Sequence, residues 1–188
     1  MPRMRAFLAL PLSPSLEQTL TGAVEGLRAQ APDSRFVAAA NLHVSVRALG
    51  TVDEAALPQM ELALRAALQL VDCFTLRVEG AGTFGKPSRP RSLFLALGGE
   101  VASLLALAQR VSEALVPVGF PAETRPLEPH LTLARARPGA GDHGLALLRR
   151  SLKLGSWGAL PVTELVLFQS EPTPGGPRHT ARIRIPLR

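Results

Sequence analysis

The sequence contains very little cysteine and no long hydrophobic run. Cys73 is the only cysteine among the 188 residues, so no disulfide can form within the chain. No apolar run approaches the roughly 20 residues that a membrane-spanning helix needs. The first twelve residues hold only a short apolar run, which Pro11 interrupts, and no small-residue cleavage site follows it. These absences predict a cytoplasmic protein without a membrane segment.

Lysine is also scarce, and yet the chain is basic. Only Lys86 and Lys153 are lysines, whereas the arginines bring the net charge to +6 and the isoelectric point to about 11.1. A basic surface suits a polyanionic partner such as RNA. A genome rich in G and C produces the same composition without any role in nucleic-acid binding. Charge alone therefore leaves both interpretations open.

Short apolar strands alternate with amphipathic helices along the whole chain. Strand patterns occupy residues 5–12, 42–49, 74–78, 92–97, 129–134, 162–168 and 180–186. Helical spacing follows Pro14 and recurs at about 57–68, 104–115 and 142–152. Interspersed elements with hairpin-like connections predict an α+β fold with mainly antiparallel sheets. No segment is typical of a linker, so we expect one bilobal domain over residues 1–188.

Two short segments carry a histidine and a hydroxyl at the same spacing. The first contains His43 and Ser45, and the second contains His130 and Thr132. Because side chains alternate between the two faces of a strand, each histidine shares a face with its hydroxyl, opposite apolar neighbours. If the two strands face a common cleft, the four polar groups converge there.

This set of groups suits the opening of a cyclic phosphodiester. An incoming water must lose a proton and a ribose oxygen must gain one, and two histidines can hold a base and an acid near neutral pH. Hydroxyl donors can stabilise the charge on the phosphate oxygens. One such segment alone is typical of a structural, hydrogen-bonded histidine. Two of them, each followed by an arginine, favour a paired-histidine site.

Segments 42–50 and 129–135 resemble the repeated His-x-Thr/Ser-x signature of the two-histidine (2H) phosphoesterase superfamily. More closely, the chain resembles the RNA 2′,3′-cyclic phosphodiesterases, also called 2′-5′ RNA ligases. The resemblance extends over nearly the whole chain and includes residues 5–10, 168–171 and 176–178. It implies a bilobal fold in which two mainly antiparallel sheets, flanked by helices, surround a central cleft in a pseudo-twofold arrangement.

The resemblance also implies roles for individual residues. His43 would be the general acid that protonates the leaving 3′ oxygen, and His130 would activate water, so that the product is a 2′-phosphate. Ser45 and Thr132 would bind phosphate oxygens, and Arg135 would add a cationic contact. No metal and no cofactor are implied. The expected partner of this monomeric enzyme is RNA with a 2′,3′-cyclic phosphate end, and the same site run in reverse could give weak 2′-5′ ligation.

Three positions depart from simple expectations. Ser45 stands where the family more often has threonine, although the hydroxyl is kept. His179 stands where a tyrosine is common, so no role is assigned to it. Arg135 would point away from His130 by simple alternation, and it reaches the same face only if the strand bulges or ends near Ala134. The basic loop 84–91 could guide RNA or stack a base, or it could be a solvated hairpin tip.

Other functions are compatible with parts of this pattern. An enzyme of the same superfamily could act on a smaller cyclic phosphate, such as an ADP-ribose derivative. A non-catalytic module could bind RNA ends without turnover. A histidine-based metal site is disfavoured, because the sequence has no close spacing of His, Asp, Glu and Cys typical of one.

Overall fold

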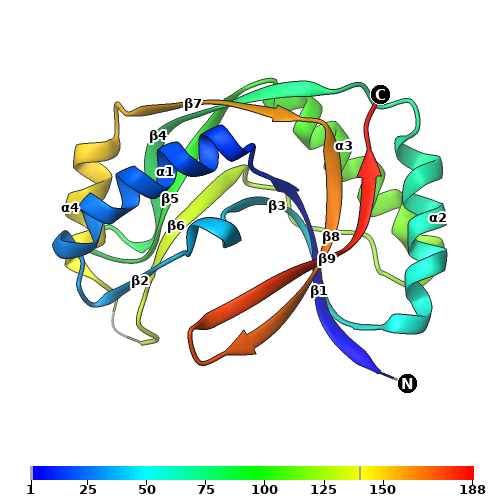
Figure 1. Cartoon of the computed structure of the whole chain (residues 1–188), viewed down its shortest axis with the longest axis horizontal. Coiled ribbons are helices and arrows are strands. Elements are labelled where there is room, and N and C mark those ends of the chain that lie inside the picture. The colour runs from blue at the N-terminus through cyan, green and yellow to red at the C-terminus, as the bar shows by residue number, and fades with distance from the viewer. Residues whose placement is uncertain (1, 140) are drawn as a thin grey trace.

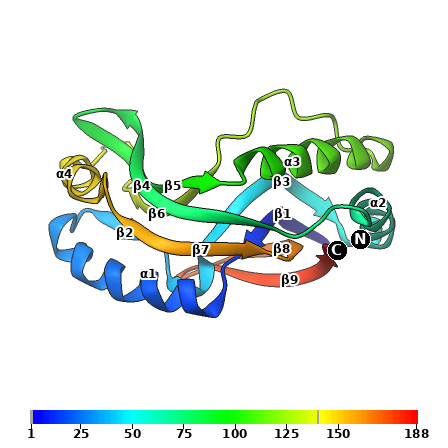
Figure 2. The same cartoon turned by 90° about the horizontal axis from the view of Figure 1, so that it is seen from above.

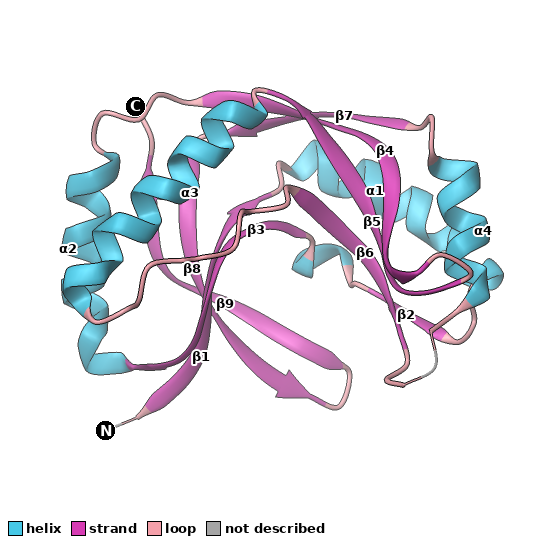
Figure 3. Cartoon of the chain, turned by 180° about the vertical axis from the view of Figure 1, so that it is seen from behind, coloured by secondary structure: helices cyan, strands magenta, loops and turns pink. Residues whose placement is uncertain are grey.

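The computed structural model describes residues 2–139 and 141–188 and has an α+β architecture with a curled antiparallel sheet (Figure 3). The helices are α1 (Pro14–Leu27), α2 (Leu57–Leu68), α3 (Val101–Leu115) and α4 (His143–Leu152). The strands are β1 (Arg3–Pro11), β2 (Ser34–Phe36), β3 (His43–Asp53), β4 (Phe74–Lys86), β5 (Arg89–Gly99), β6 (His130–Ala136), β7 (Ser156–Val162), β8 (Glu164–Thr173) and β9 (Gly176–Pro186). Their order in the sheet is β7-β4-β5-β6-β3-β1-β8-β9, with β2 beside β6.

The sheet has two halves that meet where β3 pairs with β6. One half contains β7, β4, β5, β6 and β2, and α1 and α4 pack against it. The other half contains β3, β1, β8 and β9, and α2 and α3 pack against it; Figures 1 and 2 show the two helix pairs at opposite ends of the molecule. The predicted bilobal α+β fold is confirmed, and its two sheets are continuous through the β3–β6 pair.

Local sequence signals explain where the helices begin and which face they bury. The side chain of Ser13 accepts a hydrogen bond from the backbone N–H of Leu16, which satisfies one free donor at the start of α1. Asp142 caps α4 in the same way. Leu16, Leu20 and Val24 recur at helical spacing and are buried. Burial of each such side chain stabilises the fold by about 1.5–3 kcal/mol, so the helical periodicity orients α1 on the sheet.

The helix α3 with the turn that follows it is unusually apolar. By length and composition alone, the segment Val101–Val118 could cross a membrane, which the sequence interpretation overlooked. In the folded chain, one face of α3 is buried in the core through Leu104, Leu107, Val111 and Leu115. A core helix passes the same composition test, so this segment is weak support for a membrane span.

The sequence did not predict the strands β2 and β7. With only three residues, β2 is too short to show an alternating pattern. In β7, Gly158 adopts a positive φ of 123° and Pro161 lacks an amide hydrogen, so both interrupt a strand signal. Both strands form because neighbouring strands supply their hydrogen-bond partners, which a local pattern does not reveal.

Candidate active site

The pairing of β3 with β6 brings the two histidine segments together. Val44 lies opposite Leu131, and both side chains are buried in the core. Side chains alternate along a strand, so the residues on either side of this pair lie on the opposite face of the sheet. They are His43, Ser45, His130 and Thr132.

The antiparallel register also determines which of these residues are neighbours. Continuing it by one residue in each direction places His43 opposite Thr132 and Ser45 opposite His130. Side chains directly opposite each other on antiparallel strands have Cβ atoms about 5 Å apart. Each histidine therefore lies across from the hydroxyl of the other segment.

The same backbone contact orients both histidine rings. Nδ1 of His43 lies 2.7 Å from the carbonyl oxygen of Asn41, and Nδ1 of His130 lies 2.6 Å from that of Glu128. A carbonyl oxygen can only accept, so each Nδ1 carries a proton and donates it to this bond. In both rings Nε2 is then the nitrogen that can gain or lose a proton, as acid–base chemistry requires.

A β-bulge turns Arg135 onto the face of the histidines. The β5–β6 register skips Leu133, because Thr132 and Ala134 pair with consecutive residues of β5. Leu133 and Ala134 are both buried, and the alternation shifts by one residue after them. Arg135 is exposed beyond the bulge, and its charge is close enough to His43 to lower the pKa of that ring. Of the two arrangements that the sequence left open for this arginine, the structure shows the bulge, since β6 continues to Ala136.

The arginine of the first segment has a different position. β3 also bulges after its hydroxyl, but Arg47 follows His43 by four residues, whereas Arg135 follows its histidine by five. Arg47 consequently turns into the interior, where its guanidinium donates to the carbonyl oxygens of Ser112, at 3.2 Å, and Pro121. The two arginines that follow the histidine segments are therefore not equivalent, because the alternation places one on each side of the sheet.

Burial and nearby positive charges act together on His43. Its pKa is lowered from 6.5 to about 4, chiefly because burial disfavours the charged ring. The hydrogen bond to Asn41 acts in the opposite direction, and the charges of His179, Arg135 and His130 lower the pKa further. Without a bound anion, the ring of His43 is therefore neutral at neutral pH.

This lowered pKa predicts sensitivity to acid. Between pH 6.5 and pH 4 the unfolded chain binds a proton at His43 that the folded chain does not bind, so the free energy of unfolding falls as the pH falls. Each pKa unit corresponds to about 1.4 kcal/mol. We expect His43→Asn, which keeps a donor near Nδ1, to reduce the stability loss over this range by roughly 3 kcal/mol, measured by urea unfolding at several pH values.

The matched control is the exposed His143 on α4. The stability of His143→Asn should follow that of the wild type throughout the range. If the free energy of unfolding of His43→Asn also falls with pH as steeply as that of the wild type, His43 does not cause the acid sensitivity.

Aromatic rings flank both histidines. The ring centroid of Phe7 lies 4.8 Å from that of His43, and the centroid of Phe84 lies 5.0 Å from that of His130. Phe94 lies 5.3 Å from His130 as well. The sequence pointed to Phe84 through its basic loop but not to Phe7 or Phe94. Both are ordinary apolar strand residues, and only the strand register shows that they border the site.

His179 joins this group from β9. Its ring centroid lies 5.5 Å from that of His43 and 4.9 Å from that of Phe7. Its Nδ1 is buried without a hydrogen-bond partner among the residues that the structure describes. Burial lowers its pKa, which favours the neutral ring. His179 thus adds to the burial of His43 from a strand more than a hundred residues further along the chain.

The tip of the hairpin formed by β4 and β5, which contains the basic loop 84–91, is hydrogen-bonded to the start of α4. Nδ1 of His143 lies 3.2 Å from the carbonyl oxygen of Ser88, and the backbone N–H of Asp142 donates to the carbonyl oxygen of Pro90 at 3.0 Å. Lys86, like the tip itself, remains exposed. The hairpin is thus held in place next to a helix, and its Phe84 end points to His130.

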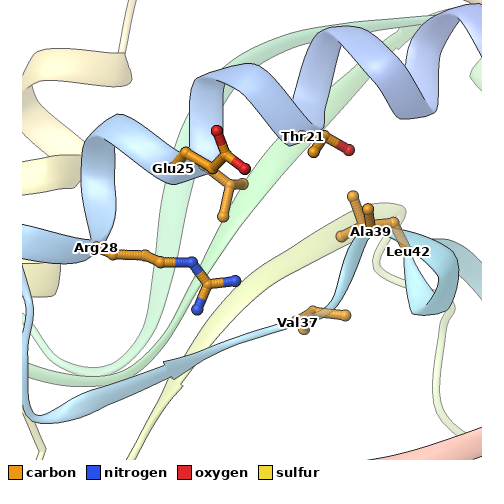
Figure 4. Close-up of a pocket in the computed structure, with 7 residues that line it drawn as sticks. Thr21, Glu25, Arg28, Val37, Ala39 and Leu42 are labelled. Atoms are coloured by element: carbon orange, nitrogen blue, oxygen red, sulfur yellow. The ribbon is translucent and has the colours of Figure 1, made fainter.

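A small, partly open pocket contains none of the histidines. It has a volume of about 80 Å³ and lies between α1 and residues 37–42 (Figure 4). Its lining residues are Thr21, Val24, Glu25, Arg28, Val37, Ala39 and Leu42, and none is a predicted site residue. Across residues 2–139 and 141–188, no group of three or more His, Cys, Asp or Glu side chains could hold a metal ion. The absence of a metal from the reaction stays a prediction.

Sequence comparisons relate this chain to a defined family. The model of the 2′-5′ RNA ligase superfamily matches residues 13–173. The RNA 2′,3′-cyclic phosphodiesterase of Methanothermobacter thermautotrophicus is 32% identical over 179 residues, which cover 95% of this chain and 96% of the relative. The protein of the same name from Archaeoglobus fulgidus is 29% identical over 180 residues, with 93% and 95% covered. These relatives support the prediction of an enzyme.

Solved structures lead to the same family. TT0787 of Thermus thermophilus has a TM-score of 0.79 and 26% identity, and the match covers 98% of both chains. E. coli LigT complexed with 3′-AMP has a TM-score of 0.75 and 26% identity, with 99% of both chains covered. The family model matches most of the chain, and the two His-x-Ser/Thr strands pair with each other. The chain therefore belongs to the 2′-5′ RNA ligase superfamily.

Proposed function

We propose that this protein hydrolyses the 2′,3′-cyclic phosphate ends of RNA to 2′-phosphates. The observation that carries this proposal is the placement of His43 and His130 on neighbouring strands. Each Nδ1 donates to a backbone carbonyl, and neither Nε2 has a hydrogen-bond partner within residues 2–139 and 141–188. Two free imidazole nitrogens beside two hydroxyls supply the acid, the base and the phosphate donors that the reaction needs. The relatives named RNA 2′,3′-cyclic phosphodiesterase support the substrate.

In the proposed reaction, Nε2 of His130 accepts a proton from water while the water oxygen attacks phosphorus. The bond between phosphorus and the 3′ oxygen breaks, and Nε2 of His43 gives that oxygen a proton. The product carries a 2′-phosphate and a 3′-hydroxyl. General acid and base catalysis contribute about 10²–10⁴-fold each.

The remaining site residues hold the phosphate. Ser45 and Thr132 donate hydroxyl hydrogens to its non-bridging oxygens, and Arg135 compensates the negative charge that grows in the transition state. The same negative charge raises the pKa of His43, which burial keeps low in the free protein. Binding of the cyclic phosphate therefore favours the protonated ring of His43, which can then give its proton to the leaving 3′ oxygen.

The deciding experiment uses an oligonucleotide that ends in a 2′,3′-cyclic phosphate. We expect conversion to a 2′-phosphate, identified by phosphorus NMR, at the same rate with and without EDTA. A 3′-phosphate product would contradict cleavage of the bond to the 3′ oxygen. Loss of activity with EDTA and its recovery with a divalent ion would instead favour a metal site.

The same assay separates the alternative functions. Hydrolysis of a cyclic phosphate on an ADP-ribose derivative, without hydrolysis of the oligonucleotide, would favour a small-molecule phosphoesterase. Binding of the RNA end without turnover would favour a non-catalytic module. Weak 2′-5′ ligation is expected when a 5′ hydroxyl takes the place of water as the nucleophile.

A further inference from the structure

We propose that Arg35 and Arg135 form a second phosphate subsite, in which Arg35 binds the 5′ phosphate of the nucleotide that carries the cyclic end and Arg135 lies between this phosphate and the cyclic one. This subsite rests on the proposed function and extends it from the reacting end to the RNA chain. It gives a role to a strand of three residues, β2, that the sequence interpretation did not detect.

The two arginines are direct neighbours in the sheet. Arg35 of β2 lies opposite Arg135 of β6 in the antiparallel register, and both are exposed. Opposite side chains share a face and start about 5 Å apart. Since the bulge in β6 turns Arg135 to the histidine face, Arg35 lies on that face as well.

The neighbours of Arg35 confirm this orientation. The hydroxyl of Ser34 donates to the carboxylate of Asp142, which caps α4 on the helix side of the sheet. Phe36 packs against the core, and the guanidinium carbon of Arg28 lies 5.6 Å from the centroid of its ring. With its two neighbours turned toward the helices, Arg35 must face the other way.

The two adjacent positive charges of Arg35 and Arg135 favour the binding of an anion. Like charges directly opposite each other destabilise a strand pair. In the part of the chain that the structure describes, neither Arg35 nor Arg135 makes an ion pair or a side-chain hydrogen bond with a protein group. A phosphate between them would remove the repulsion, and the planar guanidinium suits phosphate oxygens through paired N–H donors.

The position of the two arginines indicates which phosphate of the RNA they bind. Arg135 follows the bulge in β6 on the face that carries His130 and Thr132, and Arg35 lies one strand beyond it, in β2. Starting from the cyclic phosphate, the next anionic group along an RNA chain is the 5′ phosphate of the same nucleotide.

Binding of two product analogues tests this subsite without turnover. Calorimetry should show that the wild type binds adenosine 2′,5′-bisphosphate about tenfold more tightly than adenosine 2′-monophosphate, as one charge-assisted contact allows. Arg35→Ala should bring this ratio close to one. Arg150→Ala, which removes the same charge from the exposed side of α4, should keep it.

The ratio of kcat/KM for two substrates provides a second test of the subsite. Wild-type kcat/KM should be about tenfold higher for a nucleoside 2′,3′-cyclic phosphate with a 5′ phosphate than for one without it, and Arg35→Ala should lose the difference. Each ratio compares two ligands on one variant, so partial unfolding affects both alike. A wild-type ratio of one, or an unchanged ratio in Arg35→Ala, would overturn the subsite. Failure to hydrolyse either substrate would overturn the proposed function, while the analogue ratio would still decide on the subsite.

Discussion

Alanine in place of either His43 or His130 should lower kcat/KM for a 2′,3′-cyclic phosphate end by about 10²–10⁴-fold. The two rings lie on the same face of the β3–β6 pair, and in the proposed reaction one accepts a proton while the other donates one, so loss of either ring removes one of the two transfers. Turnover of a cyclic-ended oligonucleotide measures the effect, and circular dichroism verifies the fold. His143→Ala, whose ring lies on α4, should keep the wild-type rate. Full activity in either site variant would refute the paired-histidine site.

A sulfur substrate separates the two roles. When sulfur replaces the 3′ bridging oxygen, the leaving group needs little protonation, so this substrate should largely restore the activity of His43→Ala but not of His130→Ala. A pH profile alone cannot make this distinction, because neighbouring imidazoles titrate as a coupled pair.

The opposite rescue would be equally informative. Since burial keeps His43 neutral without substrate, this ring is already in the form that a base requires. Recovery of His130→Ala with the sulfur substrate would therefore reverse the assignment and make His43 the base. Recovery of neither variant would leave His43 as a phosphate-binding group.

Arg47→Ala should lower the free energy of unfolding by about 2–4 kcal/mol. The guanidinium of Arg47 is buried and donates to the carbonyl oxygens of Ser112 and Pro121, which connects β3 to the end of α3 and to the loop before β6. Its removal leaves these oxygens without their donor and opens a cavity, and both changes cost stability. Urea unfolding at neutral pH measures the loss.

The control is an arginine whose contacts are exposed. Arg65 pairs with Glu61 one turn away on α2 at 2.7 Å, and such surface pairs contribute less than about 1 kcal/mol. Arg65→Ala should therefore remain close to the wild type. Arg47→Lys keeps the charge with a single donor group, so its stability should lie between those of Arg47→Ala and the wild type. Equal stabilities of Arg47→Ala and Arg65→Ala would show that the buried contacts contribute nothing.

The sequence by itself determined the features that depend on neighbours a few residues apart. Helical spacing and the caps Ser13 and Asp142 locate the helices, because a helix makes its hydrogen bonds locally. Strand alternation puts each histidine on the same face as its hydroxyl, because the side-chain period of a strand is two. The two His-x-Ser/Thr segments therefore predicted a paired-histidine site, and the resemblance over nearly the whole chain added the family and the roles of the residues.

The tertiary structure alone decided how these segments meet. The pairing of Val44 with Leu131 places each histidine across from the other hydroxyl, and a strand pattern contains no information on its partner or register. The bulges had a similar effect, since the skipped residue in each strand is defined by hydrogen bonds to a neighbour far away in sequence. For this reason two arginines that look equivalent in the sequence separate, with Arg47 in the core and Arg135 beside the histidines and Arg35.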